Sequence, residues 1–140
     1  VAKAEKKAHA LIMAAAVADY QPRTTAKSKI KKDSPTLTLE LVRTPDILSE
    51  VKGNFIKVGF AAESDDVIAN AKAKLKKKGL DLIVANDITA TDSGFSVDTN
   101  KVTLIDRSGK IENLPLMTKR AVAEKILEWV AGKIGRKAGG

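Results

Sequence analysis

Continuous apolar runs separated by amphipathic stretches predict an α/β domain. Three such runs predict strands: residues 11–18, 55–61 and 80–85. The first has no polar position on either face, which predicts a central strand buried on both sides. Between the second and third runs, Val67, Ala71 and Leu75 recur every four residues and predict a helix that ends at Gly79. Because strands alternate with a helix here, we expect a mostly parallel sheet.

The segment between the first two apolar runs has a different character. Residues 19–22 are expected to form a polar turn closed by proline, and residues 23–35 to form a loop rich in Lys, Thr and Ser. Residues 36–41 alternate apolar and polar positions, which predicts a half-buried strand. Residues 44–53 begin with a Thr-Pro pair and end near a glycine, a pattern typical of a short helix.

The last third of the chain predicts a hairpin and a final helix. Residues 101–114 form two alternating stretches around a Ser-Gly turn, which predicts an antiparallel extension of the sheet. Thr118 is expected to cap a helix whose apolar positions recur every three or four residues. We therefore expect one domain over residues 1–131, followed by a basic, flexible tail over residues 132–140.

Composition excludes several classes of protein. The chain has 140 residues with no cysteine and one histidine, so disulfide scaffolds and Cys- or His-based zinc sites are excluded. The longest uncharged run is far shorter than the ~20 apolar residues of a membrane span, so we expect no membrane partner. Five aromatic residues are few for a base-stacking surface, which argues against nucleic acid as a partner. The lack of cysteine is consistent with a cytoplasmic location.

Charge points to an anionic partner. The net charge is +8, and most of the excess lies in the second half of the chain. Such a balance favours a nucleotide, a phosphorylated metabolite or a nucleic acid, and composition by itself does not choose among them. Neither a P-loop nor a G-x-G-x-x-G motif occurs in the sequence.

Three groups of residues could contact such an anion. Asp19 follows the first predicted strand, where it could bind a ribose hydroxyl or Mg²⁺. Residues 27–32 contain four lysines that could close over a polyphosphate. Lys74 and Lys78 project from one helix face and could hold adjacent phosphates. Each group also has a simpler explanation, as a turn residue, a solvated loop or lysines that favour a helix C-terminus, and each pattern taken alone favours the simpler one.

Five motifs taken in order resemble the phosphopantothenoylcysteine synthetase family. The motifs occupy residues 13–22, 29–32, 44–48, 58–63 and 85–87. In bacteria this family forms the C-terminal domain of a bifunctional coenzyme A biosynthesis protein whose other domain is a decarboxylase, a lyase. The resemblance covers about residues 11–130 and implies a Rossmann-like, three-layer fold with the N-terminal part of the family domain absent. It also implies a homodimer.

The resemblance implies a ligase activity. Members of the family join 4′-phosphopantothenate to cysteine with CTP as co-substrate and Mg²⁺ as metal. The pantothenate carboxylate attacks the α-phosphate to give an acyl-cytidylate, and the cysteine amine then displaces CMP. FMN belongs to the decarboxylase domain and is not expected to bind this chain.

Site residues follow from the resemblance by position. Lys29 would be the catalytic loop lysine, and Asp19 would contact the nucleotide and, at most, the metal. Lys74 and Lys78 would hold the phosphates. The remaining nucleotide-binding positions would be Met13, Ala14, Ala15, Pro45, Asp46, Ile47, Leu48 and Phe60.

Two departures from the family pattern leave alternatives open. Gln21 stands where the family commonly has arginine, and the chain begins at Val1 without the family's upstream half, which implies a fragment lacking the acyl-substrate site. One alternative is a catalytically incomplete nucleotide-binding or dimerisation module. Another is a basic nucleic-acid-binding domain, which would bind with a steep salt dependence.

Overall fold

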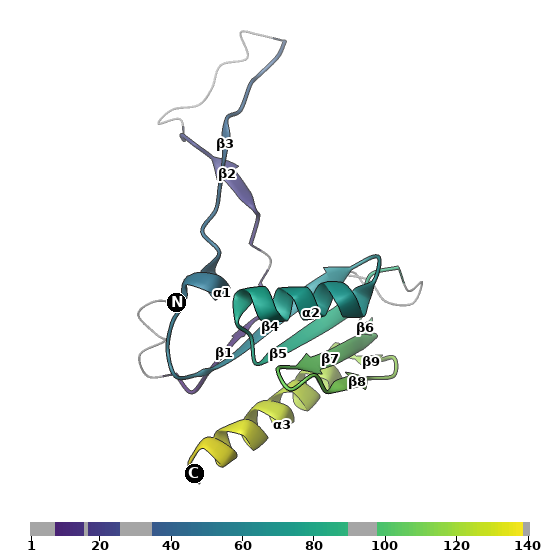
Figure 1. The fold of residues 1–140 in the computed structure, drawn as a ribbon. Helices are drawn as coiled ribbons and strands as arrows, with labels where there is room; N and C mark the ends of the chain where they lie inside the picture. Colours follow the sequence, from purple (N-terminus) through teal and green to yellow (C-terminus); the bar gives the residue numbers. More distant parts are fainter. Residues whose placement is uncertain (1–7, 16, 26–34, 90–97, 139–140) are drawn as a thin grey trace.

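A mixed β-sheet between two helical layers forms the body of the protein (Figure 1). The structure, a computed structural model, describes residues 8–15, 17–25, 35–89 and 98–138. The strands are β1 (Ala10–Met13), β2 (Tyr20–Pro22), β3 (Leu41–Arg43), β4 (Ile56–Glu63), β5 (Leu82–Asp87), β6 (Thr99–Asn100), β7 (Val102–Asp106), β8 (Ile111–Asn113) and β9 (Met117–Thr118). The helices are α1 (Ile47–Glu50), α2 (Val67–Lys78) and α3 (Lys119–Ala138).

The main sheet confirms the predicted α/β class. Its strand order is β1-β4-β5-β7-β8. The strands β1, β4 and β5 run parallel, and β7 and β8 add the expected antiparallel hairpin. A left-handed glycine, Gly79, ends α2 as expected, with its backbone N–H bonded to the last turn of the helix.

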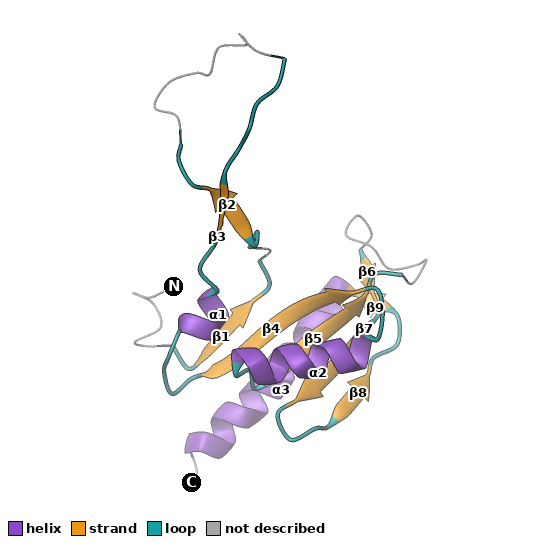
Figure 2. Ribbon diagram, turned by 45° about the horizontal axis from the view of Figure 1, so that its top comes forward, coloured by secondary structure: helices purple, strands orange, loops and turns teal. Residues whose placement is uncertain are grey.

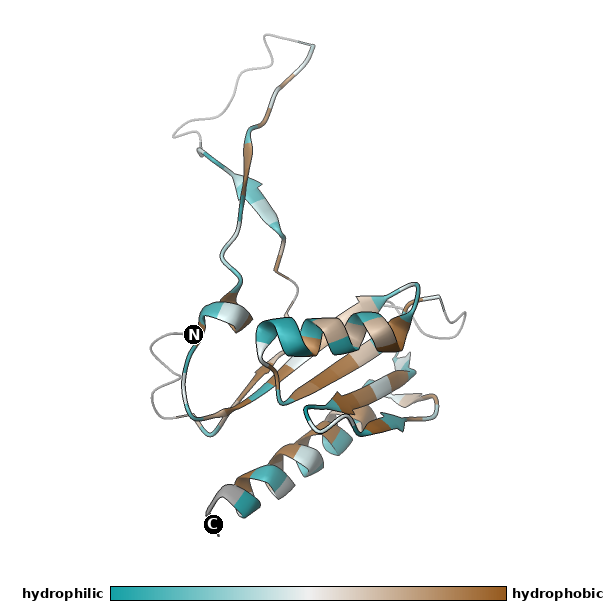
Figure 3. Cartoon of the chain, viewed as in Figure 1, coloured by the Kyte–Doolittle hydropathy of each residue, from teal (hydrophilic) through white to brown (hydrophobic). Residues whose placement is uncertain are grey.

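Alternate residues of β4 and β5 bury themselves on opposite faces of the sheet, as the two-residue period of a strand requires. Ile56, Val58, Leu82 and Val84 pack beneath α3. On the other face Ala61, Ile83 and Ala85 pack beneath α2. Apolar colour therefore concentrates on the sheet and on the helix sides that face it (Figure 3).

A close approach above β4 requires a glycine at position 59. A Cβ placed there would lie 2.7 Å from Leu80 Cδ1 and 3.3 Å from Leu48 Cδ1. Leu80 and Leu48 are buried, so neither can move aside without a cost in packing.

Gly59→Ala is therefore expected to lower the free energy of unfolding by about 1–3 kcal/mol. Urea denaturation would measure the change. Gly132→Ala is the matched control, because nothing lies within 4 Å of a Cβ there and the site is inside a helix. That variant is expected to gain roughly 0.5–1 kcal/mol, and equal effects at the two positions would contradict the packing explanation.

The segment around residues 19–43 corrects two predictions. Residues 20–22 were expected to form a turn, but they form β2 and pair with β3 in a separate two-stranded arm that extends away from the main sheet (Figure 2). The half-buried strand expected over residues 36–41 is also wrong: β3 begins only at Leu41, and Leu37 and Leu39 are 65% and 60% exposed. Among the described residues no helix or sheet packs on this arm, so alternation there creates no buried face.

The first predicted strand also differs from expectation. It covers residues 10–13 rather than 11–18, and it lies at an edge of the sheet instead of the centre. In the described part of the chain only β4 pairs with it, which leaves Ile12 38% exposed. The apolar run is long because small alanines follow the strand, not because the strand continues.

Both ends of α3 refine the sequence-based boundaries. Thr118 accepts a hydrogen bond from the backbone N–H of Ala121 (3.1 Å), which confirms it as a cap. The helix then continues to Ala138 through most of the segment expected to be a flexible tail. Trp129 and Ile134 pack against the core beneath the sheet, and the Lys133 ammonium lies 5.2 Å from the centre of the Trp129 ring. These contacts explain why the helix does not stop at residue 131.

Candidate functional site

The candidate site lies where β1 ends beside the longer β4. Met13, the last residue of β1, pairs with Gly59, and β4 continues for four more residues to Glu63. The chain leaves β1 toward the arm and returns through α1, close to α2 (Figure 1). Ligands of parallel sheets bind at such carboxyl ends, because the loops that follow the strands gather there.

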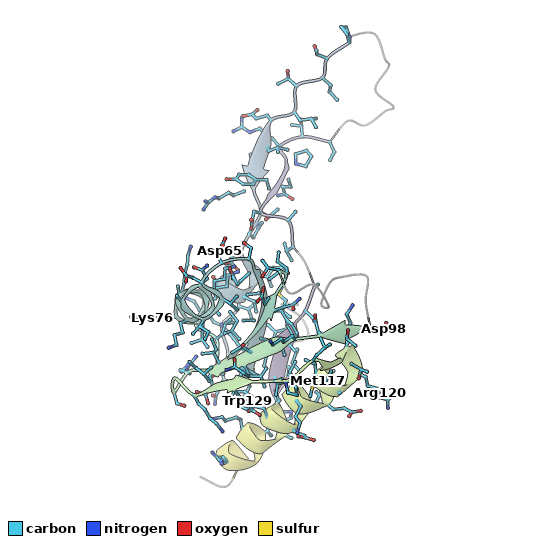
Figure 4. The ribbon with its side chains drawn as sticks, turned by 90° about the vertical axis from the view of Figure 1, so that its right-hand side faces the viewer. Asp65, Lys76, Asp98, Met117, Arg120 and Trp129 are labelled. Atoms are coloured by element: carbon cyan, nitrogen blue, oxygen red, sulfur yellow. The ribbon has the colours of Figure 1, made fainter. Side chains whose placement is uncertain are left out.

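Two lysines of α2 face carboxylates: Lys74 at the carboxyl end of β4, and Lys78 beside the start of α1. The Lys74 ammonium lies 2.5 Å from Glu63 Oε1, and the Lys78 ammonium lies 3.4 Å from Asp46 Oδ2. They are one helical turn apart, so their side chains project from one side of α2. Lys76, by contrast, is exposed and projects from the helix in Figure 4. The structure thus places the two predicted phosphate-binding lysines together.

The short helix expected over residues 44–53 is confirmed only over Ile47–Glu50, and Asp46 rather than the Thr-Pro pair begins it. The Asp46 carboxylate accepts hydrogen bonds from the Ser49 hydroxyl (2.9 Å) and the Ser49 backbone N–H (3.4 Å), which makes Asp46 the helix N-cap. Partial burial would raise the pKa of Asp46, but the bonds from Ser49 and the charge of Lys78 outweigh it and hold the pKa below its ordinary value. Asp46 therefore remains a carboxylate near Lys78.

The 45–48 segment is anchored above β1 by its last residue. Leu48 is buried with Ala71 and Leu75 of α2, and Met13 packs against the same cluster. Pro45 is exposed and Ile47 is half-buried. The buried leucine therefore anchors α1 and leaves the preceding residues at the surface beside Lys78.

Small exposed residues follow the end of β1. Ala14 and Ala15 are exposed, as is Asp19 at the start of the arm. The Asp19 carbonyl accepts a hydrogen bond from the Thr44 backbone N–H (3.0 Å), and the Thr44 hydroxyl donates to the Ala18 carbonyl. These two bonds close the base of the arm, so the segments before and after it lie side by side.

Phe60 lies on the opposite face of the sheet from the lysines. It has the same strand parity as Ile56 and Val58, which pack beneath α3. Among the described residues nothing covers it fully, and the residue is 42% exposed. Because β1 ends opposite Gly59, only a ligand that passes over this end of β1 would contact both Phe60 and the α2 face.

Lys29 lies outside the described residues. Its role as the catalytic loop lysine, and the expectation that residues 27–32 close over a polyphosphate, therefore remain predictions.

Sequence reasoning assigned no role to Glu63, although one of the five motifs, residues 58–63, contains it. Glu63 and Asp106 are the charged residues buried in the described part of the chain. The available signal was strand parity: Glu63 shares the face of Ala61, and that face lies under α2, where Lys74 is found.

Comparison with known proteins decides the family. Residues 1–134 match the DFP family, described as the DNA/pantothenate metabolism flavoprotein C-terminal domain.

The chain belongs to the DFP family.

The relatives are longer proteins. The chain is 48% identical over 124 residues to the coenzyme A biosynthesis bifunctional protein CoaBC of Bacillus subtilis, covering 86% of this chain and 30% of that protein. It is 46% identical over 120 residues to a cysteine/cysteine sulfinic acid decarboxylase from an unknown prokaryote, covering 83% and 33%. The chain thus spans about a third of these relatives, and their names describe the whole proteins.

A solved structure confirms the fold of this DFP domain. The crystal structure of the C-terminal domain of a coenzyme A biosynthesis bifunctional protein CoaBC superimposes with a TM-score of 0.75 at 33% identity. The match covers 96% of this chain and 59% of that one. The resemblance drawn from the five motifs is therefore confirmed, as is the three-layer α/β fold.

A depression in this DFP domain lies at the amino-terminal ends of β4 and β5. It has a volume of about 330 Å³, and its basic lining residues are Lys52, Lys57 and Arg107. The Lys57 ammonium donates to the carbonyls of Leu48 and Val51, and Arg107 donates to those of Gly79 and Leu80. These two cations stabilise the ends of α1 and α2, which accounts for the basic character of the depression without a ligand.

The residues that the structure describes offer neither a cluster of metal-binding side chains nor a membrane-spanning helix. No three His, Cys, Asp or Glu side chains gather there as a metal site. Over the same described ranges, no helix is both long and apolar enough to cross a membrane.

Proposed function

We propose that this chain binds CTP and that, within a longer protein, it helps to join 4′-phosphopantothenate to cysteine in coenzyme A biosynthesis. The observation that carries the proposal is the pair Lys74 and Lys78 beside α1 at the carboxyl end of β1, in a member of the DFP family. Two ammonium groups one turn apart can neutralise neighbouring phosphates.

The proposed reaction has two steps. The carboxylate of 4′-phosphopantothenate attacks the α-phosphate of CTP, and pyrophosphate leaves. The amine of cysteine then attacks the acyl carbon of the acyl-cytidylate, an amide forms, and CMP leaves with the bonding electrons. The first step brings an anion to a polyanion, so it depends on cations that offset the repulsion.

The residues of this chain would share that task. Lys74 and Lys78 would hold the phosphates, and Lys29 would offset charge that develops as pyrophosphate leaves. The loop around Lys29 would also exclude water from the acyl-cytidylate, which hydrolysis would otherwise destroy. The exposed segments 13–15 and 45–47 would receive the cytidine, together with Phe60 at the edge of β4.

Mg²⁺ fits the carboxylate that we assign to it. Proteins commonly hold this ion with one or two carboxylates and the phosphates of the bound nucleotide. Asp19 is exposed at the base of the arm, just beyond β1. When bound, the ion would neutralise phosphate charge, and Asp19 would orient it.

Calorimetry would test the proposed function directly. The chain is expected to bind CTP in the presence of Mg²⁺, and to bind it more tightly than ATP. Absence of CTP binding would contradict the proposal. Steeply salt-dependent binding to single- or double-stranded DNA would instead favour a nucleic-acid-binding domain, whereas CTP binding without pyrophosphate release would favour a catalytically incomplete module.

Asp19→Asn is expected to weaken CTP binding roughly tenfold, because a charge-assisted contact to the nucleotide or its metal is lost. Titration calorimetry in the presence of Mg²⁺ would measure the change. Glu112→Gln removes the same charge from an exposed position on β8 and serves as the control. Equal CTP affinity in Asp19→Asn and in the unmodified chain would show that Asp19 is a turn residue and does not bind the nucleotide.

We also propose that the protein forms a homodimer through the arm. Leu37, Leu39 and Leu41 are more than half exposed there, as is Tyr20. A two-stranded ribbon with exposed leucines can gain buried apolar area by pairing with a second copy.

Leu37→Glu combined with Leu39→Glu is expected to shift the protein to monomer, because the charges would be buried in the arm interface. Sedimentation equilibrium would measure the mass. A matched double variant on α3, Leu127→Glu with Ala131→Glu, alters exposed positions away from the arm and should remain dimeric. A monomeric unmodified chain would contradict the proposed dimer.

A further inference from the structure

Glu63 is a buried carboxylate whose described partner is a surface lysine. Glu63 as a whole is 8% exposed, whereas the side chain of Lys74 is 46% exposed. Burying a carboxylate without a partner would cost several kcal/mol, so the contact with Lys74 compensates its charge. The carboxylate lies beneath the helix, and the ammonium lies between it and solvent.

This arrangement constrains Lys74 more than an exposed ion pair would. A lysine side chain has four rotatable bonds and loses much freedom when it is ordered. Here a 2.5 Å contact with a group at the end of a central strand fixes the position of Nζ. An ammonium has three donors and Glu63 takes one, so Nζ can still donate to a ligand on its solvent side.

The neighbouring pair differs in this respect. Asp46 is exposed, caps α1, and contacts Lys78 at the longer distance of 3.4 Å. Its carboxylate is as accessible as the lysine, so an incoming anion would compete with Asp46 for Lys78. Of these two described pairs, only that of Lys74 has a counter-ion that lies behind the ammonium as seen from solvent.

We propose that Glu63 is the positioning residue of the phosphate site: it holds the Lys74 ammonium at the carboxyl end of β4, so that this lysine is already ordered when a triphosphate binds. The inference rests on the proposed CTP-binding function and adds to it a residue that acts through Lys74. Glu63 does not itself contact the nucleotide.

Loss of the carboxylate is expected to weaken CTP binding. In Glu63→Gln, Lys74 must be ordered at the moment of binding, which should reduce CTP affinity about threefold to tenfold. In a Lys74→Gln background the same Glu63 change is expected to have no effect on affinity, because its target is gone. Calorimetric titration of the chain, both single variants and the double variant with CTP gives this double-mutant cycle.

A direct signature of positioning comes from NMR of the lysine ammonium groups in the chain without nucleotide. The Lys74 NH₃⁺ signal is expected to be protected from exchange with water, and to lose that protection in Glu63→Gln. Glu128→Gln is the matched control for loss of a carboxylate that pairs with a lysine. Glu128 pairs with Lys125, but their charged groups are 3.4 Å apart and lie on the exposed surface of α3. Thermal denaturation shows whether each variant is folded.

The outcomes separate the two claims. Weaker CTP binding in Glu63→Gln, absent in the Lys74→Gln background and accompanied by loss of protection, supports the inference. If the unmodified chain binds CTP but the Glu63 effect persists without Lys74, or affinity rises because a repulsive charge was removed, the inference is overturned and the function stands. If the unmodified chain does not bind CTP, the proposed function fails and the inference with it.

Discussion

Replacing Lys29 by glutamine is expected to slow acyl-cytidylate formation about 100- to 1,000-fold. Removal of one group that stabilises developing charge in a transition state commonly costs this much. Glutamine is similar in size to lysine, so the fold is expected to stay intact. The effect should appear in the rate of the first chemical step rather than in CTP affinity. A single-turnover assay of pyrophosphate release would measure it, in a protein that carries this chain together with the upstream region found in its relatives.

Lys101→Gln provides the control for Lys29. Lys101 is exposed and lies just before β7, which is separated from β4 by β5. The Lys101→Gln substitution removes the same charge from the chain and should leave the rate of pyrophosphate release unchanged. A single-turnover rate in Lys29→Gln equal to that of the control would remove Lys29 from the proposed mechanism.

Leu48→Ala is expected to lower the free energy of unfolding by about 2–4 kcal/mol. Leu48 is buried in the cluster formed with α2, and its Cδ1 lies close above Gly59. Truncation would leave a cavity between α1 and β4, and it would also loosen the segment that carries Asp46. We therefore expect lower stability together with weaker CTP binding.

Urea denaturation and CTP titration would measure the two effects. Leu127→Ala is the control, because Leu127 is 55% exposed on α3 and its truncation should cost less than about 0.5 kcal/mol. A variant at position 48 that is as stable as the control would show that α1 is not held by this contact.

Local pattern was sufficient for most of the core. The apolar run of β5 and the four-residue spacing of α2 specify their elements, because the burial of each depends on its own periodicity. The same reasoning was wrong for residues 36–41. Alternation predicts a strand with one buried face only where another layer covers that face, and the described structure shows none on the arm.

The candidate site, too, could be predicted from the sequence only in part. Spacing along α2 was enough to group Lys74 with Lys78, because residues one helical turn apart share a side. No local pattern could show that these lysines meet Glu63 and Asp46, which belong to other elements. Nor could it show that Phe60 lies on the opposite face of the sheet from the lysines.

By itself, the sequence determined the α/β class, the succession of the main strands and helices along the chain and the family, since these follow from periodicity and from motifs read along the chain. Only the tertiary structure decided that β1 lies at an edge, that the arm is exposed and that Lys74 has a buried counter-ion. The physical reason is that burial and charge pairing are properties of neighbours in space. Neighbours distant in sequence are set by the packing of the whole domain.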